Sequence, residues 1–350
     1  MSGACATANF MGVITAQFDH PTFFCSQIKI ADNDSPIPRD RVFMSYQHFD
    51  NATTLTLTDA ASGFTAQKVL SIDRYTFGWE KTFVDGRYSV ELRVPVNTQL
   101  TNHLEVNNDF DIVNDGTTTS LGNVAVVVKD LLWSSECLRC SGGLLVQAPT
   151  TGDVTVRDRE TFFSKQVLSI DNLYHIRYES VILSPFVGAD VNLTKRLFTT
   201  GFLEFDFDAT GSHVDILRNL NAMPETLPRI HLYQQDLMRA DVGTGYWVYR
   251  DPQGGGITGL APVAELHYTT TLNNAQLSSF DRAPGNPIVV GNIANRLDIL
   301  NLVLGSTVEV GHRATLAVAG VVPLRGGDDK PFDWELNLEL NYRFGPGRDR

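Results

Sequence analysis

The segment Phe332-Asp-Trp-Glu-Leu-Asn-Leu-Glu-Leu-Asn-Tyr-Arg-Phe344 alternates between apolar and polar residues without a break. Apolar residues hold every even position, so a β-strand here has one apolar and one polar face. The alternation runs for 13 residues, 332–344, whereas soluble strands are usually about 5–6 residues long and membrane-spanning strands about 9–11. The segment therefore predicts a membrane-spanning strand. We expect lipid to meet Leu336, Leu338 and Leu340, and the interior to be lined by Glu335, Asn337 and Glu339.

The same alternation recurs upstream and predicts further strands. One hairpin has its turn at Val84-Asp-Gly86 and arms on both sides, because Asp-Gly is a favoured turn sequence. A second hairpin turns at residues 194–196. Other arms are expected at Met238–Arg250, Leu260–Thr270, Leu297–Val310 and Ala314–Leu324, with weaker strands at Val42–Phe49, Leu121–Leu132 and Tyr174–Leu183. Residues 214–223 are expected to form a short loop helix, and Thr101–Ser120 a long extramembrane loop.

These strands predict an all-β fold, a single antiparallel transmembrane β-barrel of about 12 strands with long loops. The first strand near Val42 should pair with the last, which ends near Phe344, because an open edge cannot lie in lipid. We divide the chain into an N-terminal extension (1–40), either periplasmic or plug-like, the barrel (41–345) and a C-terminal tail (346–350). A soluble sandwich also alternates. However, aromatic residues near arm ends, such as Phe332 and Trp334, fit the interfacial girdles of a membrane barrel.

Composition narrows the range of functions. The net charge of -12 argues against a nucleic-acid partner. The longest strongly apolar stretch, Ala314–Leu324, is too short for a spanning helix. The first Lys or Arg is Lys29, so no secretory signal is visible in this numbering. We expect a leader upstream of Met1 and a bacterial outer-membrane location, against the alternative of a cytosolic protein.

Several segments resemble predicted outer-membrane β-barrel proteins of planctomycete-type bacteria. They are Ile30–Tyr46, Gly78–Pro95, Gly245–Arg250, Val322–Leu324 and Phe332–Gly345. The resemblance implies an outer-membrane location and a porin- or transporter-like role. It supplies no binding residues. Tyr342 and Phe344 also look like the C-terminal signal read by the barrel-insertion machinery, although Gly345–Arg350 extends beyond it.

Charged residues on the polar faces are the candidate lumen lining, since a charge facing lipid at the midplane costs about 2–4 kcal/mol. These candidates are Arg74, Glu80, Arg87, Glu91, Arg93, Glu204, Asp206, Asp208, Glu265, His267, Glu335, Glu339 and Arg343. All three inward candidates on the arm from Leu203 to Asp208 are carboxylates. This predicts a modest cation preference, which inward arginines could offset.

No catalytic or metal motif is recognised, and no cofactor is expected. Cys137 and Cys140 form the single C-x-x-C, which predicts either a short-loop disulfide or unpaired thiols rather than a metal site. Asp32, Asp34 and Asp40 are more consistent with a solvated turn than with a Ca²⁺ loop.

The sequence thus favours a non-enzymatic outer-membrane channel or transporter that passes small solutes through a charged lumen. The alternatives are a structural or anchoring barrel with a filled interior and, less favoured, an outer-membrane barrel hydrolase. The expected partners are outer-membrane lipid, the insertion machinery and small solutes, with a homo-oligomer as an open alternative.

Overall fold

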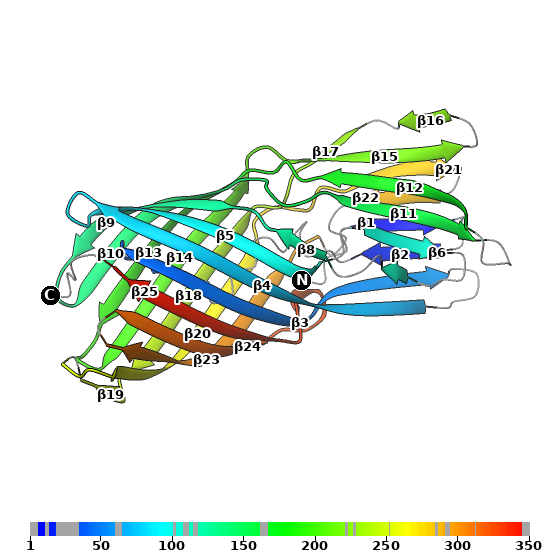
Figure 1. Cartoon of the computed structure of the whole chain (residues 1–350). Helices are drawn as coiled ribbons and strands as arrows, with labels where there is room; N and C mark the ends of the chain where they lie inside the picture. Colours follow the sequence, from blue (N-terminus) through cyan, green and yellow to red (C-terminus); the bar gives the residue numbers. More distant parts are fainter. Residues whose placement is uncertain are drawn as a thin grey trace.

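The structure is a computed structural model, and it is a long β-barrel extended at one end by further strands (Figure 1). It describes residues 6–10, 14–18, 35–59, 65–100, 103–107, 112–114, 118–161, 167–220, 223–226, 229–251, 253–283, 286–290, 295–311 and 313–344. Asp32 and Asp34 of the proposed acidic turn, and the tail 346–350, lie outside these residues.

Twelve antiparallel strands form a closed ring, which confirms the predicted fold class. In order around the barrel they are β3 (Arg41–Asp59), β4 (Thr65–Phe83), β5 (Tyr88–Leu100), β9 (Ala125–Ser134), β10 (Leu138–Gln147), β13 (Ile182–Asn192), β14 (Leu197–Asp208), β18 (Leu237–Tyr246), β20 (Ile257–Thr271), β23 (Asp298–Val310), β24 (Ala314–Pro323) and β25 (Trp334–Arg343). The first and last strands close the ring, with Arg343 opposite Arg41 and Trp334 opposite Asp50.

One end of the barrel, here called the short-turn end, carries mostly tight connections. The turn between β4 and β5 is the one predicted at Val84-Asp-Gly86, and all three residues have positive φ. Gly86 adopts this conformation freely, whereas branched Val84 does so at a steric cost. A longer connection at this end contains the short strand β19 (Tyr249–Arg250).

The opposite end, the long-loop end, carries additional strands beyond the barrel (Figure 1). These are β1 (Ala6–Phe10), β2 (Ile14–Phe18), β6 (His103–Asn107), β7 (Ile112–Asn114), β8 (Thr118–Leu121), β11 (Val154–Thr161), β12 (Val167–Arg177), β15 (Ser212–Leu220), β16 (Met223–Thr226), β17 (Ile230–Leu232), β21 (Ser278–Ala283) and β22 (Asn286–Val290). The helix predicted at 214–223 is therefore wrong, because its described residues lie in β15 and β16. The strand predicted at Tyr174–Leu183 is interrupted after Arg177.

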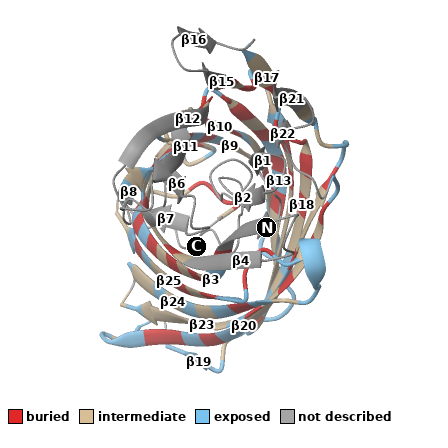
Figure 2. Cartoon of the chain, turned by 90° about the vertical axis from the view of Figure 1, so that its right-hand side faces the viewer, coloured by how far each residue is buried: buried red, intermediate tan, exposed pale blue. Residues whose placement is uncertain are grey.

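Burial alternates along the barrel strands, as the banding in Figure 2 shows, and it is inverted relative to a soluble protein. On β25 the inward-facing Glu335 is 1% exposed, whereas the outward-facing Leu340 is 51% exposed. The outward faces of the other barrel strands likewise expose large apolar residues such as Phe77, Trp79 and Leu304. An apolar outer belt around a polar interior is the arrangement of a membrane barrel.

One short 3-10 helix (Gly327–Asp329) lies in the connection from β24 to β25. Within the described part of the chain, no helix combines the length and the apolar character of a membrane span.

Candidate functional site: the barrel lumen

A buried cluster of charges lies inside the barrel toward the short-turn end. Arg41 Nε donates to Glu80 Oε2 at 2.8 Å, and Arg41 also donates to Glu91 Oε2 at 3.0 Å. Lys129 Nζ lies 2.7 Å from Glu91 and 3.2 Å from Glu80, and Arg93 Nε donates to Glu91. These five residues come from four neighbouring strands, β3, β4, β5 and β9. Since all five are buried, each charge depends on its partners for compensation.

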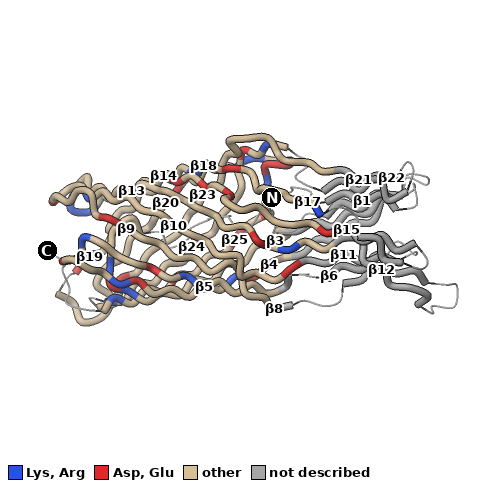
Figure 3. Tube along the Cα trace, turned by 90° about the horizontal axis from the view of Figure 1, so that it is seen from above, with Lys and Arg blue, Asp and Glu red and all other residues tan. Residues whose placement is uncertain are grey.

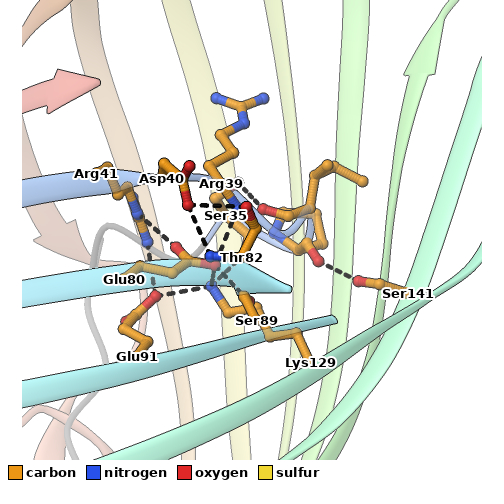
Figure 4. Close-up of polar contacts among 12 residues, drawn as sticks. Ser35, Arg39, Asp40, Arg41, Glu80, Thr82, Ser89, Glu91, Lys129 and Ser141 are labelled. Carbon is orange, nitrogen blue, oxygen red and sulfur yellow. Dashed lines mark hydrogen bonds and ion pairs between the residues drawn. The ribbon is translucent and has the colours of Figure 1, made fainter. Parts of the chain in front are cut away.

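This charge cluster holds a segment of backbone in the lumen, which we call the strap (residues 35–40) (Figure 4). Lys129 Nζ donates to the Ser35 carbonyl at 3.0 Å, and the Ser141 hydroxyl donates to the Pro36 carbonyl. The Arg39 amide donates to Glu80 Oε1 at 3.2 Å. Pro36, Ile37 and Pro38 are buried in the described interior. The strap therefore occupies the side of the lumen formed by β4, β5, β9, β10 and β13.

Asp40 ends the strap and is held from the next strand. Its carboxylate accepts from the Thr82 amide at 2.7 Å and the Thr82 hydroxyl at 2.8 Å, and Lys81 Nζ lies 3.0 Å away. These contacts give Asp40 a structural role. A plug-like role for the whole of residues 1–40 stays a prediction, because residues 19–34 lie outside the described part.

A second buried group joins β14 and β18. Arg239 Nε donates to Asp206 at 2.6 Å and lies 4.0 Å from Glu204, and all three side chains are almost completely buried. Glu204 and Asp206 thus share one arginine from the neighbouring strand and are hidden from water. They cannot supply the cation preference that the sequence assigned to the arm from Leu203 to Asp208.

A cluster of packed apolar side chains lies inside the barrel nearer the long-loop end. Phe49, Ile72, Val303, Val321 and Phe332 belong to one buried apolar cluster, which we call the closing layer. The rings of Phe49 and Phe332 meet edge-on, with centroids 5.6 Å apart. The placement of Phe332 in an outer girdle is therefore wrong. It is 1% exposed and packs inside the barrel, whereas Trp334 lies outside.

A polar rim adjoins the closing layer. Gln47 Nε2 donates to Glu335 Oε1 at 3.2 Å, and both residues are buried, as is Asn337 on the next inward position of β25. The predicted inward placement of Glu335 and Asn337 agrees with this burial. On β25 they adjoin the apolar cluster, with Glu335 directly opposite Phe49.

The inner face of β18, β20, β23, β24 and β25 differs from the strap side of the lumen. Toward the short-turn end, most of its inward-facing residues are partly exposed. His267 joins two carboxylates here, with Nε2 2.7 Å from Glu265 and Nδ1 3.6 Å from Asp241. We call this face the accessible wall. Its partly exposed inward-facing residues are Asp241, Gly243, Val263, Glu265, Gly305, Thr307, Glu309, Thr315, Ala317, Ala319, Glu339 and Arg343.

Three remaining candidates lie away from this wall. Arg74 Nε donates to Asn97 at 3.0 Å inside the barrel. Arg87 lies in the turn before β5, is 58% exposed, and pairs with Asp130 at 3.1 Å, so it does not line the lumen. Asp208 ends β14 at the long-loop end and accepts from Ser180, Gly211 and Gln234. Burial raises the pKa of the nearby loop carboxyl of Asp236, and the charge of Asp208 adds to this.

Sequence reasoning missed the central cations of the lumen. Arg41, Lys129 and Arg239 were not among the candidates, although each stands at a polar-face position of its strand. Lys129 was the most visible, because a single charge that follows the apolar residues 125–128 and faces inward requires a buried partner. The first half of the strap carried no signal, because Ser35 and Pro36 contact the lumen wall through their backbone carbonyls.

The cysteines form no described metal or disulfide site. Cys137 and Cys140 are free thiols, so the short-loop disulfide is not formed. Among the residues that the structure describes, no group of three or more His, Cys, Asp or Glu side chains is arranged to hold a metal ion.

No family model matches the sequence, and no curated protein matches it either. Among solved structures, the chain is similar to the COG4313 outer membrane channel from Pseudomonas putida F1, with 10% identity, a TM-score of 0.50, and coverage of 91% of this chain and 100% of that one. It is also similar to the β domain of the Bordetella autotransporter BrkA, with 12% identity, a TM-score of 0.50, and coverage of 87% and 100%. At such identities the likeness concerns the fold, which is that of an outer-membrane β-barrel.

Proposed function

We propose that this protein is an outer-membrane channel or transporter for small solutes, and that the described conformation is closed. The observation that carries the proposal is the inverted polarity of the barrel, with exposed apolar residues outside and a charged, partly water-accessible wall inside. A lumen wall that water reaches offers solutes a path, whereas the interior of a purely structural barrel can be filled by side chains throughout.

The orientation follows from the two ends of the barrel. Bacterial outer-membrane barrels have short periplasmic turns and longer extracellular loops, so we place the short-turn end in the periplasm. Figure 3 shows Lys and Arg at that end, where Lys195, Arg196 and Arg250 are exposed. In this orientation the accessible wall opens to the periplasm, and the closing layer separates it from the outside.

The similar structure from Pseudomonas putida is described as an outer membrane channel, which agrees with this role. The charged, partly accessible wall supports the role more directly. A structural or anchoring barrel is the second candidate, favoured by the buried closing layer and the strap. A hydrolase is weaker, because His267 contacts the carboxylates Glu265 and Asp241, whereas a serine hydrolase needs a serine on its histidine.

Planar-bilayer recording of the purified protein tests the proposal. We expect discrete conductance steps that are rare at low voltage, since the closing layer must rearrange before ions pass. The Phe332→Ala protein, which lacks the central ring of that layer, should open more often. A folded Phe332→Ala protein without any conductance would assign the chain to the structural alternative.

A further inference from the structure

The two sides of the lumen differ in how far their inward-facing residues are buried. On the strap side, the inward-facing Ser89, Glu91, Lys129, Ser141 and Ser184 are all buried at no more than 2% exposure. On the accessible wall, Asp241 is 22% and Glu265 31% exposed. Water therefore reaches the accessible wall, whereas on the strap side it is excluded from these five residues and reaches Arg39, Arg139 and Asp190 nearer the short-turn end.

Small side chains explain why the accessible wall stays open. The strand register places Val263 opposite Gly305 and Gly305 opposite Ala319, in one row across three strands. In the next row, Thr307 lies opposite Ala317, which lies opposite Glu339 on β25. These short residues cover little of their neighbours, in keeping with the partial exposure of the wall, while the strap packs against the opposite side.

The charge along this wall is mostly negative. Its carboxylates are Asp241, Glu265, Glu309 and Glu339, and its arginine is Arg343. His267 lies between two of these carboxylates, with Nε2 2.7 Å from Glu265 and Nδ1 3.6 Å from Asp241. A carboxylate-lined path in a low-dielectric wall concentrates cations and repels anions.

We propose that permeating solutes move along the accessible wall, beside the strap rather than through the barrel axis, and that this route favours small cations over anions. The inference rests on the proposed channel function. In this proposal the cation preference comes from Asp241, Glu265, Glu309 and Glu339, and not from Glu204 and Asp206.

Cysteine modification during bilayer recording tests the route. In a background with all four native cysteines changed to serine, we would compare Thr307→Cys on the accessible wall with Ser184→Cys on the strap side. A thiol-reactive cationic methanethiosulfonate should lower the Thr307→Cys current by about half or more, because added bulk and positive charge obstruct a cation path. The Ser184→Cys current should not change.

The outcomes separate the two claims. Block of the Ser184→Cys channel, or conduction through Thr307→Cys that the reagent leaves unchanged, would overturn the route. Faster block by an anionic reagent, or an anion-selective reversal potential in a salt gradient, would overturn the cation preference. Loss of all conductance in the cysteine-free parent and in Phe332→Ala alike would instead count against the proposed channel.

Discussion

Replacing Phe332 by alanine should increase solute flux through the barrel by about tenfold or more. Phe332 is 1% exposed in the closing layer, and truncation of a buried phenylalanine costs about 3–5 kcal/mol of packing energy. Part of this loss falls on the closed conformation alone, and about 1.4 kcal/mol is enough to change the open population tenfold. Swelling of proteoliposomes in an uncharged sugar would measure the flux.

Trp334 provides the matched control for this prediction. It lies two residues away and is also aromatic, but it is 44% exposed on the outer face. Trp334→Ala should therefore leave the flux unchanged while removing a similar amount of apolar side chain. Equal flux in wild-type, Phe332→Ala and Trp334→Ala proteins, all shown to be folded, would mean that the closing layer does not close the lumen.

Glu91→Gln should destabilise the barrel by about 3–5 kcal/mol, the usual loss when a buried ion pair is broken on one side. Glu91 accepts from Arg41, Arg93 and Lys129, and glutamine keeps its shape but removes its charge. The cluster would then hold three buried cations against the single carboxylate of Glu80. Urea unfolding of the protein in lipid vesicles measures the change in free energy.

The exposed ion pair of Arg87 and Asp130 is the control for charge removal. Because exposed pairs contribute little, Arg87→Gln should unfold at nearly the same urea concentration as the wild type. If Glu91→Gln and Arg87→Gln unfolded alike, the charge cluster would not be a stabilising element of the lumen.

Much of the fold follows from local pattern, because alternation is a property of each strand by itself. The segment 332–344 predicted its own strand, its facing and its pairing with the first strand. By contrast, β10 was not identified, because Gly142 and Gly143 interrupt its alternation. Residues 214–223 suggested a helix, and pairing of β15 with β12 and β17 overrides that local tendency.

The lumen could be predicted only in part, because its organisation depends on long-range contacts. Alternation identified the polar faces that carry Glu80 and Glu91. It could not show that Lys129, 38 residues from Glu91, would join them and bind the strap. Nor could it distinguish Glu204, which is buried beside Arg239, from Glu265, which water reaches.

Spin labels at two adjacent positions of β25 test the central claim most directly, namely that this chain is a membrane barrel with lipid outside and water inside. Leu340 is 51% exposed on the outer face, and Glu339 faces the accessible wall. In liposomes, a label at Leu340→Cys should be relaxed mainly by oxygen, which dissolves in lipid, and a label at Glu339→Cys mainly by a water-soluble nickel complex. The opposite division, or equal access of the nickel complex to both labels, would contradict the account, since a shift of one residue exchanges the two faces.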